Sequence, residues 1–269
     1  MTVRPAPADS GVVFVRTDLA VGAGVIPATG DSVCETRLGT TIGNRDGASV
    51  STIEHLMAVL AGLGIDNALV EIDAAEAPIM EGAADEILAA IDGVGLRRQD
   101  LPRRHIEILE PVEVVERGKR VALVPADQFE MSVEILFEDA LIGHQRLELA
   151  IDEATFRDEL AGARTFGFLA EVEQLRAAGL GRGASLDNTV VVDGGEVLNP
   201  GGLRRPDEFV RHKALDALGD LYLLGAPIVG RYEGRCGGHA MNNALVRALL
   251  ARPEAWRYVT RTPELAEAV

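Results

Sequence analysis

The stretch Ser51–Asp73 reads STIEHLMAVLAGLGIDNALVEID. It decides the fold, because the spacing of its apolar residues changes from that of a helix to that of a strand. Up to Gly64 the apolar residues recur three or four positions apart, as on one face of a helix, and the glycine is a typical helix stop. Asn67–Asp73 has the pattern of a short strand, and a second helical pattern covers Ala83–Ile91. Helix, strand, turn and helix in this order are typical of an α+β module.

The second half of the chain ends in the same order of elements. A helix is predicted over Pro206–Leu224, a strand over Pro227–Glu233 and a helix over His239–Ala251. The polar segment Leu96–Arg104 contains a proline and interrupts the patterns, so we place a domain boundary there. Further strands are predicted within Gly11–Ile42 and at His105–Val115, Val121–Pro125, Met131–Phe137 and Thr189–Asp193. The sequence therefore predicts an α+β fold of two similar two-layer domains, residues 1–101 and 102–269.

The composition excludes several classes of partner. A formal net charge of −16 disfavours nucleic acid, because contacts to phosphates need clusters of basic residues. The two cysteines, Cys34 and Cys236, form no CxxC pair, which favours a reducing compartment. The chain has no run of 18 apolar residues, and Met1–Ser10 lacks the layout of a signal peptide. We therefore expect a cytoplasmic protein without a membrane-spanning segment or a nucleic-acid partner.

The segment Val210–Asp220, VRHKALDALGD, carries two groups that can bind a metal together. His212 and Asp216 are four positions apart on a predicted helix, so both project from nearly the same face, and Asp220 follows one turn later. Lys213 is one of only two lysines in the chain. The alternative to a metal site is a hydrogen-bonded pair on one helix.

Glu54 and His55 lie in the first turn of the helix predicted after Ser51. One interpretation is structural, because Ser51 and Glu54 match a capping box and His55 can be an ordinary core histidine. The other interpretation is catalytic. A third ligand would complete the open three-ligand site that hydrolytic zinc requires, and the neighbouring carboxylate would be placed to take a proton from the bound water.

Two further segments contain groups at positions suited to chemistry. In Arg235–Asn243, RCGGHAMNN, two glycines precede His239 at the start of a predicted helix, where an imidazole suits an oxyanion or a leaving amine. In Arg164–Phe168, RTFGF, Thr165 can offer a hydroxyl donor and Phe166 can form a wall. An ordinary cap-region histidine and a buried strand or loop are the respective alternatives.

Taken in order, these segments resemble the UDP-3-O-acyl-N-acetylglucosamine deacetylases, the committed enzymes of lipid A synthesis in Gram-negative bacteria. The resemblance covers nearly the whole chain and rests on these strings: RPAPADSGVVFVRTDL from Arg4, STIEHLMAVLAGLGIDNALVEI, ARTFGF, GASLDNTVVVD, VRHKALDALGDLYLLG, GHAMNNALVRALLA and EAWRYVT. It implies zinc-dependent hydrolysis of UDP-3-O-acyl-N-acetylglucosamine to UDP-3-O-acyl-glucosamine and acetate, with iron(II) as the alternative metal. It also implies that helices pack between the sheets of the two domains, with the active site at the domain interface.

Carried over motif by motif, the resemblance also implies the roles of the candidate residues at the reaction centre. The metal ligands would be His55, His212 and Asp216, and Glu54 would be the general base. His239 would be the second catalytic residue. Whether this histidine or the general base protonates the departing amine stays open at this point.

The same resemblance implies roles around that centre. Asp220 would orient the second catalytic histidine, and Thr165 would help to hold the oxyanion. Lys213 would meet the anionic nucleotide or the developing charge, and Phe166 would contact the substrate. An insert at about residues 167–192 would form an apolar passage for the acyl chain. Its apolar residues fit such a passage or an ordinary core: Phe168, Leu169, Val172, Leu175, Val190 and Val191.

The chain departs from the family pattern at two places. Family members usually begin about two dozen residues earlier, with a strand and a GVGLHSG-like turn, whereas Met1 here falls where that strand should end. A lost edge strand leaves ladder hydrogen bonds unmade, so we expect reduced stability or activity; a start codon assigned too far downstream is the simpler explanation. The family's FxHP segment reads Phe137-Glu138-Asp139-Ala140 here, so the role of its histidine is not carried over.

Two other functions stay open from the sequence. One is a catalytically impaired or non-catalytic protein that binds the nucleotide-sugar lipid, and the other is a zinc amidohydrolase that acts on a different N-acetyl sugar. We expect a monomer in each case.

Overall fold

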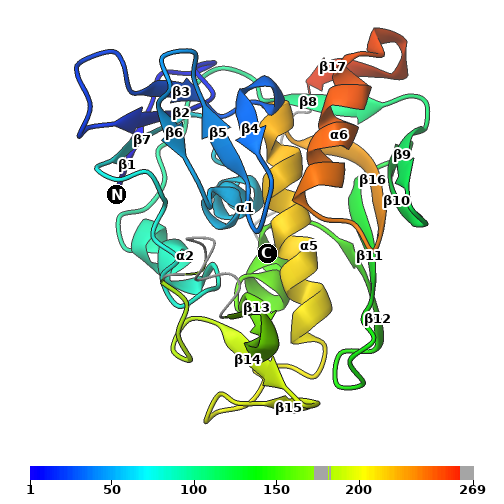
Figure 1. Ribbon diagram of the computed structural model, residues 1–269. Helices are drawn as coiled ribbons and strands as arrows, with labels where there is room; N and C mark the ends of the chain where they lie inside the picture. Colours follow the sequence, from blue (N-terminus) through cyan, green and yellow to red (C-terminus); the bar gives the residue numbers. More distant parts are fainter. Residues whose placement is uncertain (173–180, 182, 261–269) are drawn as a thin grey trace, which may run out of the picture.

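The first half of the chain folds into two small β-sheets, seen in a computed structural model that describes residues 1–172, 181 and 183–260 (Figure 1). The larger sheet has the order β1 (Thr2–Pro5), β7 (Ala68–Ile72), β2 (Val12–Arg16) and β3 (Val25–Pro27). The smaller sheet has the order β4 (Val33–Glu35), β5 (Thr41–Gly43) and β6 (Ser49–Val50). In β7, Ala68, Val70 and Ile72 are buried and the residues between them are not, which confirms the predicted strand.

The second half is built around a seven-stranded sheet. Its strands are β8 (Arg104–Ile108), β9 (Val112–Glu116), β10 (Lys119–Val124), β11 (Phe129–Leu136), β12 (His144–Ala150), β16 (Ile228–Arg235) and β17 (Trp256–Thr260). The strand β16 pairs in parallel with β11 and β8 and antiparallel with β10. A separate small sheet contains β13 (Phe166–Phe168), β14 (Val190–Asp193) and β15 (Glu196–Val197).

Helices lie between the sheets of the two halves, as Figure 1 shows for α1 and α5. The longer helices are α1 (Glu54–Gly62), α2 (Asp85–Asp92), α5 (Glu208–Leu221) and α6 (His239–Leu250). The shorter ones are η1 (Gly30–Ser32), α3 (Glu153–Thr155), η2 (Phe156–Leu160), η3 (Tyr222–Leu224) and η4 (Pro253–Ala255). The fold is therefore α+β, as the sequence predicts. Within the described residues, no helix has both the length and the apolar character needed to cross a bilayer.

The sheets support the proposed division into domains. Each described sheet draws its strands from one side only of residues 96–104. On this ground we propose two domains, residues 1–101 and 102–269, with α1 of the first packed along α5 of the second.

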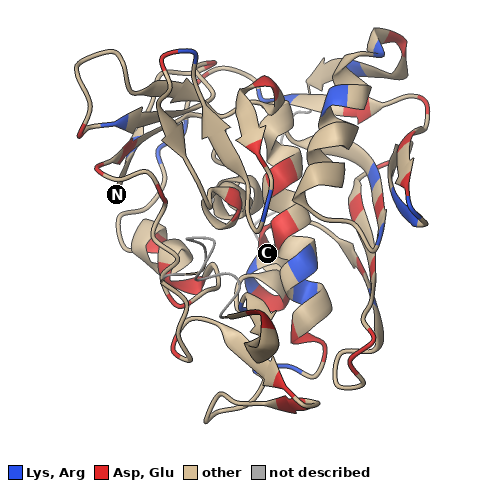
Figure 2. Ribbon diagram, viewed as in Figure 1, with Lys and Arg blue, Asp and Glu red and all other residues tan. Residues whose placement is uncertain are grey.

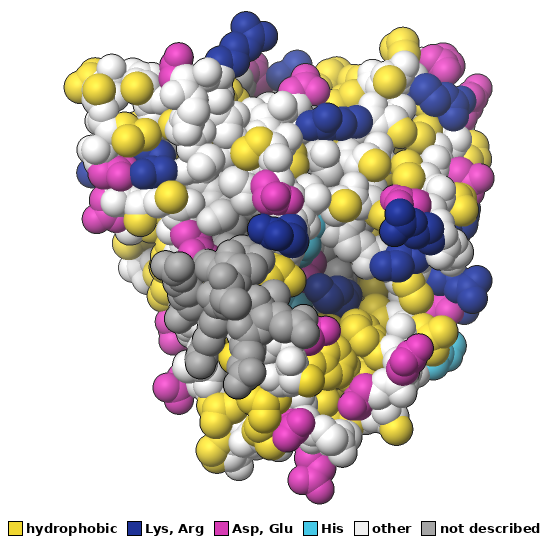
Figure 3. Space-filling view, viewed as in Figure 1, with side chains coloured by type: hydrophobic (Ala, Val, Ile, Leu, Met, Phe, Trp, Pro, Cys, Tyr) yellow, Lys and Arg dark blue, Asp and Glu magenta, His cyan; other side chains and the backbone are white. Residues whose placement is uncertain are grey.

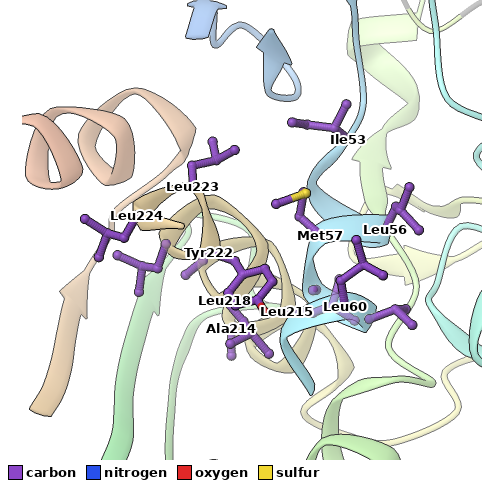
Figure 4. Packing of buried hydrophobic residues seen from close by; sticks show 14 of the residues in the cluster. Ile53, Leu56, Met57, Leu60, Ala214, Leu215, Leu218, Tyr222, Leu223 and Leu224 are labelled. Carbon is purple, nitrogen blue, oxygen red and sulfur yellow. The ribbon is translucent and has the colours of Figure 1, made fainter. Parts of the chain in front are cut away.

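The crossing of α1 and α5 brings the two halves close together at one glycine. A Cβ atom on Gly219 of α5 would lie 2.0 Å from the backbone oxygen of Glu54, so only glycine lets α1 approach this far. Further along α1, Leu60 lies beside Leu215 of α5, and both are completely buried (Figure 4). Apolar packing and the small residue together fix how the first turn of α1 faces α5.

The structure differs from the predicted elements at several places, and three of these differences have a clear physical reason. The predicted strand His105–Val115 is two strands, β8 and β9, separated by Leu109–Pro111, because proline has no N–H for a ladder. The strand β12 was not predicted, since only Leu147 within it is buried and an edge strand carries a weak pattern. The helix α1 begins at Glu54 rather than at Ser51, because Thr52 has a positive φ of 58°.

Candidate metal centre

The start of α1 presents Glu54 and His55 to the interior. Both side chains are buried, at 3% and 5% exposure of the residue. The capping-box interpretation is wrong, because the helix has no side-chain cap and the Ser51 hydroxyl donates to the carbonyl oxygen of Ala75. The Glu54 carboxylate instead accepts a hydrogen bond from the backbone N–H of Thr40 at 2.9 Å. The carboxylate is thus free of any capping role.

His212 and Asp216 project from adjacent turns of α5 toward His55. The Asp216 Oδ1 atom lies 3.4 Å from His212 Nε2 and 3.6 Å from His55 Nε2. One donor atom from each residue lies within 4.8 Å of the other two, and all three residues are buried. The three metal ligands implied by the sequence therefore meet at one point.

Hydrogen bonds outside this cluster fix the chemical form of its members. The carbonyl oxygen of Ala163 lies 3.0 Å from His212 Nδ1, so this nitrogen carries the proton and Nε2 keeps a lone pair. The Lys213 ammonium donates to Asp216 Oδ2 at 2.8 Å, which leaves Oδ1 directed at the histidines.

The pKa values of the two α5 residues shift in the directions that suit metal ligands. Burial, with a smaller effect of the His55 and Lys213 charges, lowers the pKa of His212 to about 3. Burial would raise the pKa of Asp216, but interactions with His212 and with the Lys213 ammonium outweigh it and hold that pKa well below its usual value. Neutral imidazole and ionised carboxylate are the forms that bind metals.

The donor set fits a divalent metal. Two imidazole nitrogens and one carboxylate oxygen are a common set for hydrolytic zinc, which keeps its fourth position for water. The hydrogen bond from His212 to Ala163 is the outer contact expected of a metal-bound histidine. Glu54 stands next to His55 in sequence but outside the ligand set, so its carboxylate is available for proton transfer.

A second group, formed by the partly buried His239 and the buried Asp220, lies close to this cluster. The Nδ1 atom of His239, the first residue of α6, lies 2.9 Å from Asp220 Oδ2. Asn242 donates to the same oxygen at 2.8 Å, and the Thr40 hydroxyl donates to Asp220 Oδ1 at 2.5 Å. Burial lowers the pKa of His239, but the Asp220 carboxylate outweighs it and raises that pKa to about 9. The imidazole is therefore protonated at neutral pH.

A cleft connects the two groups. It is lined by Lys213 and Asp216 of α5, by Gly237 and Gly238 before α6, and by His239. Figure 3 shows a hollow beside α5 with His and Lys or Arg side chains in it and apolar side chains bordering it. Along α5 itself, Arg211 and Lys213 lie in the N-terminal half, which begins with Glu208, and the two aspartates lie in the C-terminal half; Figure 2 shows these charges along the helix.

The segment after Ala163 borders the metal cluster. The Phe166 ring centroid lies 6.3 Å from that of His212, and Lys213 Nζ lies 5.5 Å from the same ring. Thr165 is held by its backbone, which donates to the carbonyl oxygen of Gly82 at 2.7 Å. The structure therefore brings Phe166 and Lys213 to the cluster, and Thr165 is the neighbour of that ring in sequence.

The residues expected to line an acyl passage lie in and after β13. Leu169 is 41% exposed, Val172 is partly buried, and Val191 lies between the buried Val190 and Val192 of β14. Leu175, and residues 173–180 and 182 of the expected insert, lie outside the described residues. Exposed and half-buried apolar side chains fit the expected passage, which stays a proposal.

Comparison with known proteins gives the family. A family model described as UDP-3-O-acyl N-acetylglycosamine deacetylase matches residues 1–251. The chain belongs to this family. Its curated relatives include UDP-3-O-acyl-N-acetylglucosamine deacetylases of three bacteria. The chain is 60% identical to that of Phenylobacterium zucineum over 100% of the chain and 92% of the relative. It is 48% identical to that of Myxococcus xanthus over 96% of the chain and 82% of the relative. It is 46% identical to that of Hahella chejuensis over 97% of the chain and 86% of the relative.

Sequence reasoning missed three residues of the site. Asn242 stands three positions after His239 on α6, so helical spacing from that histidine could have found it. Tyr232 of β16, which donates to Asn242 Oδ1 at 2.7 Å, and Thr40, the residue before β5, are distant from each other in sequence. No spacing in the sequence connects those two residues to the site.

Proposed function

We propose that the protein is a zinc-dependent deacetylase that hydrolyses UDP-3-O-acyl-N-acetylglucosamine to UDP-3-O-acyl-glucosamine and acetate. One observation carries the proposal: the donor atoms of His55, His212 and Asp216 converge beside a buried carboxylate and a partly buried imidazole–carboxylate pair. The names of the relatives supply the substrate. Iron(II) accepts the same nitrogen and oxygen donors and is the alternative metal.

Glu54 is the proposed general base. A divalent metal bound at the cluster supplies a Lewis acid for the acetamide carbonyl and lowers the pKa of a water molecule. Burial raises the pKa of the Glu54 carboxyl, although the charges of His239 and His55 oppose the shift. A carboxylate whose pKa lies closer to neutrality is a better proton acceptor. Glu54 takes a proton as the water oxygen attacks the carbonyl carbon.

His239 is the proposed general acid. Its imidazolium form is favoured because Asp220 accepts the hydrogen bond from Nδ1, which leaves Nε2–H as the proton to be transferred. When the bond between the carbonyl carbon and the nitrogen breaks, this proton passes to the departing amine and acetate is released. After this step Glu54 carries the proton that it took from water, and His239 is uncharged. His239 takes up a proton before the next turnover, which restores its imidazolium form.

The remaining candidates have proposed roles in binding. Lys213 meets negative charge on the nucleotide or on the carbonyl oxygen, and Thr165 donates its hydroxyl to that oxygen. Phe166 forms a wall next to the His212 ring, as their ring contact supports. The acyl chain lies along apolar residues of the insert: Leu169, Val172 and Val191.

Acetate release from UDP-3-O-acyl-N-acetylglucosamine tests the proposal. Wild type should release acetate with one zinc per chain, whereas His212→Ala should bind no zinc and release none. His144→Ala is the matched control, because this exposed histidine contacts Glu134 rather than the cluster and should behave as wild type. Zinc binding without acetate release would favour a non-catalytic binding protein. Equal turnover of UDP-N-acetylglucosamine would favour a different N-acetyl sugar as the substrate.

A further inference from the structure

One buried threonine touches both groups that move protons in the proposed reaction. Thr40, the residue before β5, is 1% exposed. Its backbone N–H donates to Glu54 Oε2 at 2.9 Å, and its hydroxyl donates to Asp220 Oδ1 at 2.5 Å. The same hydroxyl oxygen lies 3.3 Å from His239 Nδ1. Thr40 comes from the first half of the chain, whereas Asp220 and His239 come from the second.

We infer that Thr40 is a positioning residue, which holds Glu54 through its backbone and fixes the Asp220–His239 pair through its hydroxyl. The inference rests on the proposed function for the roles of these groups. Thr40 itself contacts neither the cluster donors nor, in the proposed reaction, the substrate, so it acts through Glu54, Asp220 and His239.

The hydrogen bonds of Asp220 show why the hydroxyl matters. Oδ2 accepts from His239 Nδ1 and from Asn242, and Asn242 is in turn held by Tyr232. Oδ1 accepts from Thr40. Because both carboxylate oxygens of Asp220 accept hydrogen bonds, the carboxylate cannot rotate about the Cβ–Cγ bond without breaking them. Without the hydroxyl, Oδ1 of the buried Asp220 loses its donor, and rotation of the carboxylate away from the imidazole becomes less unfavourable.

The chain before Thr40 is shaped to make both contacts. Leu38 has a positive φ of 64°, and a Cβ atom on Gly39 would lie 2.8 Å from Glu54 Oε1. The absence of a side chain at Gly39 lets the backbone reach the carboxylate. The contacts of Thr40 are therefore built into the approach to β5.

Thr40→Val tests the hydroxyl alone, because the variant keeps the shape of the side chain and the N–H bond to Glu54. Since general acid catalysis contributes about 10²–10⁴-fold, misdirecting the acid should lower kcat by about 10-fold to 100-fold with KM within about twofold. Thr40→Ser restores the donor and should recover most of the rate. Thr41→Val is the matched control on the neighbouring residue of β5 and should keep the wild-type kcat.

A double-mutant cycle distinguishes positioning from a general loss of structure. In an Asp220→Asn background, Thr40→Val should lower kcat by less than about twofold, because its effect passes through the lost carboxylate. Zinc content and melting temperature of the zinc-loaded variants are measured beside the rates. A kcat for Thr40→Val equal to that of Thr41→Val, or effects that simply add in the cycle, would overturn the inference. So would loss of zinc or of the folded state in both Thr40→Val and Thr40→Ala.

An NMR readout separates this inference from the proposed function. In ¹⁵N-histidine-labelled, zinc-loaded protein, the Nδ1–H resonance of His239, assigned with His239→Gln, should shift in Thr40→Val and stay in place in Thr41→Val. If wild type released no acetate, the proposed function would fail, and an unchanged resonance in Thr40→Val would then overturn the inference independently.

Discussion

At the scale of single residues, two aspartates one turn apart on α5 have different neighbours. Asp216 faces two histidines and is held by Lys213, whereas Asp220 faces His239. Asp216 is therefore suited to binding a metal, and Asp220 is suited to stabilising an imidazolium. Residue type and spacing cannot separate these roles, since both carboxylates lie on one stripe of the helix.

The pH dependence of kcat should report on His239. Its pKa is raised to about 9, so the imidazolium form is present below that pH and is lost as the pH rises through it. We expect kcat to fall above about pH 9. In Asp220→Asn the negative charge that raises the pKa of His239 is absent, so the fall in kcat at alkaline pH should move to lower pH. If kcat of Asp220→Asn falls at the same alkaline pH as that of wild type, another group donates the proton.

Gly39→Ala should impair the base without removing the metal. A Cβ atom at this position lies 2.8 Å from Glu54 Oε1, so the carboxylate must move from its present place. We expect kcat to fall by about 10²-fold, the lower range for general base catalysis, with one zinc per chain retained. Gly201→Ala is the control, because a Cβ atom there meets nothing within 4 Å. Equal rates for the two variants would count against the role of Glu54.

At the scale of elements, the site depends on the crossing of α1 with α5. The predictions for the helices α1, α2, α5 and α6 are confirmed to within a few residues, because each carries a clear apolar face. The proximity of His212 and Asp216 on α5 was predictable for the same reason, since spacing along one helix fixes which side chains share a face. Thr40 and Tyr232 could not be predicted, because strand register and tertiary packing bring them to the site.

Gly219→Ala should disturb the helix crossing itself. A Cβ atom there lies 2.0 Å from the Glu54 backbone oxygen and 3.1 Å from the Ala58 nitrogen, so backbone rather than a flexible side chain must move. We expect a loss of about 1–3 kcal/mol in the free energy of unfolding, together with weaker zinc binding. Thermal unfolding and zinc titration measure the two effects. Wild-type values for both would show that α1 does not need this close approach.

At the scale of the whole molecule, the metal cluster joins the two halves of the chain. His55 comes from the first half, and His212 and Asp216 come from the second. A metal bound to all three residues therefore stabilises the packing of one half on the other. The three candidate ligands meet only in the folded state, because His55 lies far from His212 and Asp216 along an unfolded chain.

Metal removal should therefore lower the melting temperature. A ligand that binds only the folded state at 100 times its Kd stabilises it by about 2.7 kcal/mol. We expect a chelator to lower the melting temperature of wild type and zinc to restore it. His55→Ala should melt near the chelated value with or without zinc, and a zinc-dependent rise in this variant would place the metal elsewhere.

Zinc titration into metal-free protein, followed by acetate release from UDP-3-O-acyl-N-acetylglucosamine, tests the central claim most directly. The account predicts that activity rises linearly and saturates at one zinc per chain, and that His212→Ala stays inactive throughout. Acetate release by metal-free wild type, or by His212→Ala, would contradict a reaction centred on His55, His212 and Asp216.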